Sequence, residues 1–273
     1  MLNPCGPTDF TQTTVTTFGA LLPNTLFYFN GGTYNANGTV SLVPGQIVES
    51  RSAGYTQPAT DTARSTINTN QIGLNGNNSL VNIILSGTTN FNGKVVAAGL
   101  NNVITGSQIG TSGFPQSIGV RNTGGSLRID NTVVSSTSSI GLFLEGGSTS
   151  VENSTINILG NIPTGIDSSN GARVTLNNVR IQGTGTFIAG ISATSSNVNA
   201  TNTAISISTT SASGIASGLQ TSNSGTIQFA GGSISVDQGI IVSDQTIIRI
   251  RNGNNIVIDG LTVCQVNFSI VPC

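Results

Sequence analysis

The chain has 273 residues, only 7% of them charged, with nine Lys and Arg against ten Asp and Glu and no His. Nine basic residues balanced by ten acids cannot form the basic stripe that binds phosphates, which excludes a nucleic-acid partner. The absence of His excludes a Ser-His-Asp or Cys-His catalytic apparatus and a His-based zinc site.

Residues 1–40 are predicted to form an N-terminal cap. They lack the repeat that occupies the rest of the chain and contain the apolar groups 21–22 and 26–29, followed by the turn signal Asn30-Gly31-Gly32. Terminal repeats of stacked proteins differ from the others because they cover an open core. The chain opens without a basic segment and an apolar core, so no signal peptide is predicted, and no apolar run is long enough for a membrane span.

The polar stretch from Ser50 to Thr69 is predicted to be a protruding loop, because it is the largest interruption in the repeat domain of residues 41–263. This loop carries Arg51, Tyr55, Asp61 and Arg64.

One template recurs along the domain. Apolar residues stand four and two positions before a bend residue, and another apolar residue stands three positions after it, as in Leu127, Ile129, Asn131 and Val134. The bend residues are Asn82, Gly106, Asn131, Asn153, Asn178, Asn202, Gly231 and Gly260. Their successive separations are 24, 25, 22, 25, 24, 29 and 29 residues, so eight repeats of one unit are visible.

The bend position holds only Asn and Gly. These are the two residues that most readily adopt a left-handed backbone conformation, so a sharp bend between two short strands is predicted in every repeat. Stacking the repeats would align Asn131, Asn153, Asn178 and Asn202 in a column whose amides can bond to one another.

A second marker, a Gly between two mostly apolar residues, recurs about twelve residues before each bend and predicts a third strand. The marker glycines are Gly119, Gly141, Gly165, Gly190 and Gly218. Three short strands per repeat and no helical pattern predict an all-β parallel β-solenoid of about eight to ten coils. From roughly residue 72 to 263 the ladder resembles the right-handed parallel β-helix of pectate lyases, phage tailspikes and autotransporter passenger domains.

The three cysteines lie at the two ends of the chain. Cys264 and Cys273 fall in a predicted C-terminal cap, residues 264–273, where a disulfide would stabilise the protein by about 2 to 3 kcal/mol. If Cys5 sits at the other end of the rod, it lies roughly 40 Å from either partner. It is then expected to be a small buried or unpaired cysteine, and a free thiol or a link to another chain are the alternatives.

Asp130 and Glu152 occupy the position before the bend in consecutive repeats and are predicted to stack on the outer face, about 4.8 Å apart. That spacing is close to the roughly 5 Å carboxyl separation of retaining glycosidases. Arg128 lies two residues before Asp130 on the same face and could neutralise the pair. Two solvated acids beside an arginine are the favoured interpretation, and an acid with a nucleophile is the alternative.

The resemblance to lyases implies a further alternative, in which an acidic cluster binds calcium and a basic residue removes a proton. Asp130 and Glu152 with Arg128 or Arg173 supply these residue types, but no extended acidic motif accompanies them. We therefore predict no cofactor, with calcium as the alternative. Arg173 and Arg180 are predicted to be exposed strand positions.

The types of surface side chain bear on two possible ligands, a carbohydrate and ice. A carbohydrate platform would use exposed rings, for which Phe143 and Phe187 are the candidates. Ice binding would use regular threonine columns, but the positions after the bend hold Thr132, Ser154, Val179 and Thr203, which are too irregular.

Few Lys, no His and a surface of Thr, Asn and Ser indicate an extracellular or cell-surface protein. We predict a non-catalytic, adhesin-like or structural module that presents loops to a host or environmental glycan or protein, with end-to-end or side-by-side self-association. The alternative function is a polysaccharide lyase or glycoside hydrolase of the pectate-lyase or tailspike type that uses the outward carboxylates.

Overall fold

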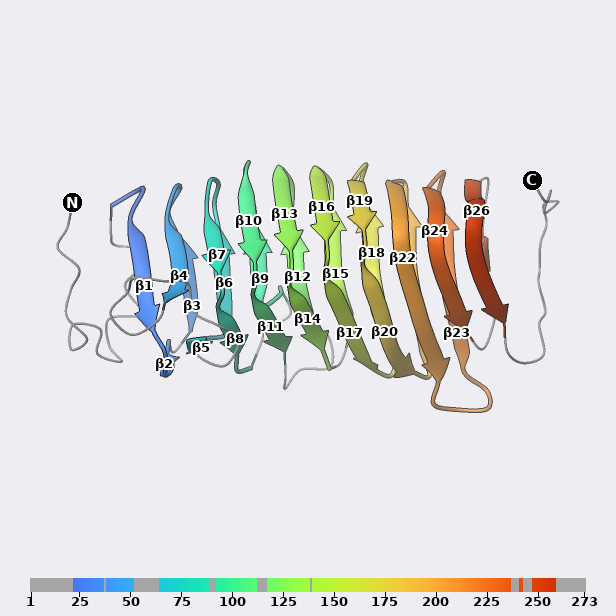
Figure 1. The fold of residues 1–273 in the computed structure, drawn as a ribbon, viewed down its shortest axis with the longest axis horizontal. Coiled ribbons are helices and arrows are strands. Elements are labelled where there is room, and N and C mark those ends of the chain that lie inside the picture. Colours follow the sequence, from blue (N-terminus) through green and yellow to red (C-terminus); the bar gives the residue numbers. More distant parts are fainter. Residues whose placement is uncertain are drawn as a thin grey trace.

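The computed structural model describes residues 22–36, 38–51, 64–88, 92–111, 117–137, 139–236, 241–242 and 247–258. The described part contains strands and no helix, and Figure 1 shows the strands stacked side by side along one long axis. The strand pairings are parallel from the first coil to the last. The predicted all-β parallel β-helix is confirmed, and in the described residues no helix is long and apolar enough to span a membrane.

Each coil contributes strands to three ladders. The first ladder contains β1 (Leu26–Asn30), β4 (Ile47–Arg51), β7 (Ser79–Val81), β10 (Asn102–Thr105), β13 (Ser126–Asp130), β16 (Ser148–Glu152) and β19 (Arg173–Asn177). The second contains β2 (Thr33–Asn35), β5 (Thr66–Asn68), β8 (Ile84–Ser86), β11 (Gln108–Thr111), β14 (Val133–Ser136), β17 (Thr155–Gly160) and β20 (Arg180–Gly185). The long strands β22 (Asn197–Thr209), β24 (Thr226–Val236) and β26 (Ile247–Ile258) continue both ladders.

The third ladder is a separate sheet. Its nine strands are β3 (Thr39–Leu42), β6 (Gln71–Leu74), β9 (Val95–Ala97), β12 (Ile118–Asn122), β15 (Ile140–Glu145), β18 (Thr164–Ser169), β21 (Phe187–Thr194), β23 (Ile215–Ser222) and β25 (Ile241–Val242). Nine stacked strands correspond to about eight turns.

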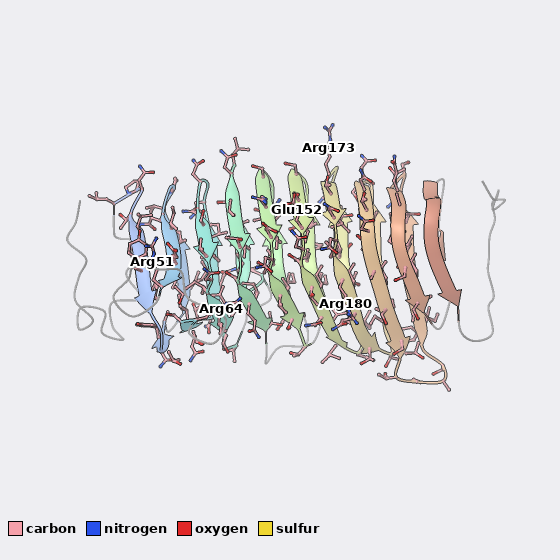
Figure 2. All side chains as sticks on the ribbon, viewed as in Figure 1. Arg51, Arg64, Glu152, Arg173 and Arg180 are labelled. Atoms are coloured by element: carbon pink, nitrogen blue, oxygen red, sulfur yellow. The ribbon has the colours of Figure 1, made fainter. Side chains whose placement is uncertain are left out.

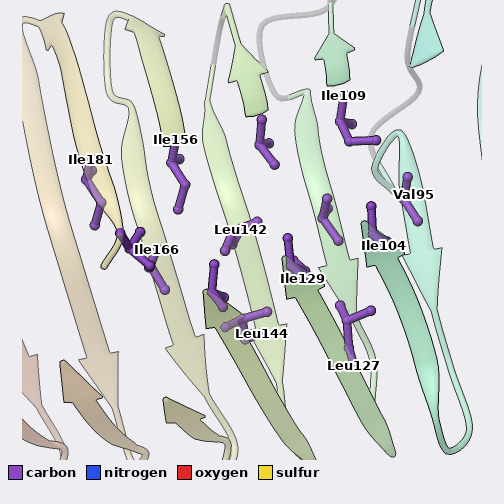
Figure 3. Packing of buried hydrophobic residues seen from close by; sticks show 14 of the residues in the cluster. Val95, Ile104, Ile109, Leu127, Ile129, Leu142, Leu144, Ile156, Ile166 and Ile181 are labelled. Atoms are coloured by element: carbon purple, nitrogen blue, oxygen red, sulfur yellow. The ribbon is translucent and has the colours of Figure 1, made fainter. Parts of the chain in front are cut away.

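The core is a set of columns in which like side chains stack on like. The position two before the bend holds Ile104, Ile129, Val151 and Leu176 in register, and all four are fully buried. Figure 3 shows Ile104 and Ile129 of this column, with Leu142, Leu144 and Ile166 of the third ladder, in the space between the sheets. The apolar template positions therefore face the interior, as predicted.

The marker glycines form a column of their own inside the third ladder. A Cβ added to Gly165 would lie 2.5 Å from the carbonyl oxygen of Gly190 and 2.5 Å from Cγ2 of Ile181. The same two kinds of contact recur at Gly141, with the Gly165 oxygen and Ile156. Glycine is required here because the third ladder approaches the β-branched side chains of the second ladder too closely for any side chain.

The described bend residues all have a positive φ, from 46° at Asn131 to 64° at Gly231. Where a bend Gly stacks on the bend Asn of the preceding coil, the Asn side-chain amide occupies the space that a Cβ would need. A Cβ on Gly106 would lie 2.2 Å from Asn82 Oδ1. Asn178 Nδ2 donates to Asn153 Oδ1 at 3.0 Å, as expected of an amide column. Asn153, however, donates to Asp130 Oδ1 at 3.1 Å.

A second amide ladder, which the template did not predict, is buried in the N-terminal coils. Gln46, Asn78 and Asn102 are inaccessible to solvent. Asn78 Nδ2 donates to the Val43 oxygen at 2.7 Å, and Asn102 Oδ1 accepts from the backbone of Asn78 at 3.3 Å. These amides satisfy backbone groups that a wholly apolar interior would leave without partners.

The positions after the bend face inward, so their side chains are not available to a surface ligand such as ice. Thr132, Ser154, Val179 and Thr203 are buried. Thr132 Oγ1 donates to the Asp130 oxygen at 2.9 Å, and Ser154 Oγ accepts from the Thr132 amide at 3.1 Å. The bend adds one residue between the two strands. Inward and outward positions are therefore exchanged in the strand that follows the bend.

The segments predicted as cap and loop partly join the stack. Strands β1 and β2 lie within residues 1–40 and pair with β4 and β5. Strand β4 reaches Arg51 and β5 begins at Thr66, with Ser50 Oγ accepting from the Ser65 amide at 2.8 Å. Tyr55, Asp61, Gly260, the C-terminal cap and all three cysteines, Cys5, Cys264 and Cys273, lie outside the described residues.

Candidate functional site

The structure brings together the three residues predicted for the outer face of the first ladder. The register of β13 and β16 sets Asp130 beside Glu152. Arg128 Nη2 lies 3.1 Å from Asp130 Oδ2 and 3.2 Å from Glu152 Oε2. One guanidinium therefore bridges the two carboxylates, and these three residues are called the Arg128 cluster below.

The other oxygen of each carboxylate in the Arg128 cluster is also engaged. Asn153 Nδ2 donates to Asp130 Oδ1 at 3.1 Å, and Ser150 Oγ donates to Glu152 Oε1 at 3.1 Å. Arg128 is exposed over about half its side chain, so the ion pairs contribute at most about 1 kcal/mol. Chemically, the cluster is a surface network with a net charge of −1, in which each of the four carboxylate oxygens already has one partner.

The Arg128 cluster does not fit calcium. Calcium prefers six to eight oxygen ligands with a net negative charge, and here a guanidinium lies between the two carboxylates. Asn177 and Thr201 follow Glu152 in the same column and add no charge. Across the described ranges, no group of three or more Asp, Glu, Cys or His side chains could hold a metal ion.

A second group of chemically capable side chains lies on the outer face of the third ladder. The register aligns Arg121, Phe143, Asp167 and Ser192 on consecutive coils. Arg121 Nε donates to Glu145 Oε2 at 2.5 Å, and its guanidinium carbon lies 5.5 Å from the centre of the Phe143 ring. Arg121, Phe143, Glu145 and Asp167 are called the third-ladder cluster.

Asp167 is the carboxylate of this cluster with an altered pKa. Burial raises its pKa above the usual range, the negative charge of Glu145 raises it further, and a hydrogen bond from Ser192 acts in the opposite direction. Asp167 therefore keeps its proton to a higher pH than an exposed aspartate. The cluster therefore combines a partly buried carboxyl group with a second carboxylate that is ion-paired to Arg121.

The sequence contained a signal for the third-ladder cluster that the template did not use. Counting two residues on from the marker glycines gives Arg121, Phe143, Asp167, Ser192 and Gln220, which is the outward column. The template was anchored on the bend, so it aligned only the first and second ladders.

The remaining surface residues named from the sequence differ in exposure and in their contacts. Phe187 is exposed over 46% of its surface, whereas Phe143 is half-buried beneath Arg121. Arg173 and Arg180 are exposed at the starts of their strands, and Figure 2 shows Arg173 projecting beyond the edge of the stack. Arg51, also labelled there, lies 3.0 Å from Glu49 and 4.1 Å above the Tyr28 ring.

Comparison with known proteins adds no relative. No protein-family model matches the chain, and no curated protein sequence matches it. Function is therefore inferred from the fold and from the two surface clusters.

Proposed function

We propose that the protein is a non-catalytic rod of the extracellular space or cell surface, adhesin-like or structural, which presents its outer faces to a glycan or protein. The observation that carries this proposal is the state of the Arg128 cluster. All four oxygens of Asp130 and Glu152 accept hydrogen bonds from Arg128, Ser150 or Asn153. Glycoside cleavage needs two carboxyl groups that flank the scissile bond, whereas these two carboxylates converge on one guanidinium.

The surface next to the Arg128 cluster supports a role in binding. Outward positions on the following coils form two columns of uncharged hydrogen-bonding side chains. The first column holds Ser150, Thr175, Asn199 and Gln228, and the second holds Asn177 and Thr201. Successive members are about 4.8 Å apart. Such a surface offers donors and acceptors at a regular spacing to a polymer that carries hydroxyl groups.

The proposal is tested by light scattering after size exclusion of the protein mixed with neutral and acidic polysaccharides, with and without calcium. We expect co-elution with a polymer whose length does not change, and the same result for Asp130→Asn with Glu152→Gln. A variant with Thr175→Ala and Asn199→Ala should weaken co-elution. It removes the two middle members of the first column, which spans four coils, while the strands stay intact. Shortening of a polymer by the wild-type protein would contradict the non-catalytic role.

A second candidate, a polysaccharide-cleaving enzyme, is favoured by one observation in the third-ladder cluster. Burial raises the pKa of Asp167, and Glu145 beside it forms an ion pair with Arg121. Two neighbouring carboxylates in unlike environments are typical of an acid and a base in glycoside hydrolysis. Loss of cleavage in Asp167→Asn and in Glu145→Gln, but not in the Asp130 and Glu152 variant, would establish this candidate.

A further inference from the structure

Exposed apolar side chains gather on one part of the rod. Of the seven large apolar side chains that are exposed in the described residues, four lie between positions 159 and 215. Their exposed fractions are 49% at Leu159, 64% at Ile162, 46% at Phe187 and 37% at Ile215. Isolated exposed apolar residues are normal on a soluble protein, but contiguous ones mark an interaction surface.

Three of these residues stack in one column where the chain enters the third ladder. Phe187 pairs with Ile215 in the register of β21 and β23. The Phe187 amide donates to the Asn161 oxygen at 2.9 Å and the Ala189 amide to the Pro163 oxygen at 3.0 Å, which pairs Phe187 with Ile162. Ile162, Phe187 and Ile215 therefore succeed one another at about 4.8 Å and are called the corner ladder.

The core does not require these side chains. The residue after each member of the corner ladder, Pro163, Ile188 and Ala216, is buried and fills the interior. Uncharged polar residues adjoin the ladder: Thr186 precedes Phe187, and its Oγ1 lies 3.4 Å from Thr210 Oγ1. An apolar centre with an uncharged polar rim is the composition of a protein–protein interface.

We propose that the corner ladder is a self-association surface on which two copies of the chain pack side by side. A second copy carries apolar side chains at the same coil spacing, so those of one rod can fit between those of the other. The ladder lies on a side of the rod, and a two-fold axis can place it against itself in a closed dimer. The chain has a net charge of −1, so electrostatic repulsion between copies is small.

The size of the patch requires the contact to extend along the rods. Stable interfaces bury roughly 800 Å² per partner, more than the three side chains of the corner ladder supply. Parallel or antiparallel rods bring the threonine rim of neighbouring coils into contact as well. The inference depends on the fold and on these exposed residues, and it is independent of the proposed binding of glycans.

The test compares the mass of the full chain by light scattering and sedimentation across a concentration series. We expect a dimer for the wild type and a monomer for Ile162→Ser with Phe187→Ser and Ile215→Ser. Leu100→Ser is the matched control, because Leu100 is 62% exposed and lies outside the corner ladder. This control should remain dimeric.

A single substitution, Phe187→Glu, gives an independent readout, because a two-fold axis would bring two like charges close together. It should produce a monomer whose far-ultraviolet circular dichroism is unchanged. A wild type that stays monomeric at every concentration overturns the proposal. A folded triple variant that remains a dimer overturns it as well.

Discussion

Lys94 is the only lysine in the sequence, and its side chain is completely buried. Its ammonium group donates to the carbonyl oxygens of Thr69, Gly87 and Thr88, the last two at 2.9 and 3.4 Å. Desolvation lowers its pKa from 10.5 to about 8. The charged form is therefore disfavoured in the folded state, although three oxygens bind it.

The pH dependence of stability follows from this lowered pKa. Between pH 8 and 10.5 the unfolded chain binds the Lys94 proton more strongly than the folded chain, so the free energy of unfolding rises with pH. The rise contributed by Lys94 is about 3 kcal/mol. Urea unfolding at pH 7, 9 and 10.5 should show this rise in the wild type and not in Lys94→Met. Equal slopes for the two proteins would refute the assignment to Lys94.

At the scale of the element, the third ladder depends on its glycine column. These glycines have ordinary backbone angles, and their role is steric, since a methyl group at Gly165 would overlap both the next coil and the second ladder. Gly110 on β11 is a matched position, because an added Cβ there would meet its nearest atom, the Leu85 oxygen, at 3.5 Å.

We predict that Gly165→Ala lowers the free energy of unfolding by about 1 to 3 kcal/mol through overpacking. Gly110→Ala should change it by less than about 1 kcal/mol, since a gain from reduced chain entropy offsets any small contact. Denaturant unfolding of the two variants measures the difference. Equal stabilities would show that the coils can shift apart and that the column is not tightly packed.

The repeats of the sequence were aligned on the bend residue, and this choice determined which contacts between strands could be predicted. The bend residue fixes the register of the first and second ladders, so the stacking of Asp130 on Glu152 was predictable from spacing. That Arg128 could neutralise the pair was also predicted, but the oxygens that it contacts were not, because they depend on the rotamer of a long side chain. The inward side of Thr132 was not predicted, because the bend interrupts the alternation of the strand. Lys94 lies in a corner between strands, which the template does not cover.

At the scale of the whole molecule, the protein behaves as a one-dimensional stack. Each described coil pairs only with the coil before it and the coil after it, as the successive pairings of β13, β16 and β19 show. Stability should then be a sum of coil contributions and contacts between neighbouring coils. Figure 1 shows the consequence, a rod whose length is set by the number of coils.

Removal of one complete coil should therefore leave a folded, shorter rod. Deleting residues 132–153 joins Asn131 to Ser154, so Asp130 faces Asn177 and every column continues. The rod should shorten by about 4.8 Å, measurable by small-angle X-ray scattering, and should unfold at a lower urea concentration. Deleting residues 132–142 instead places third-ladder residues where the second ladder should be, and this variant should not fold. Equal behaviour of the two deletions would mean that register does not control folding, because only the first preserves the columns.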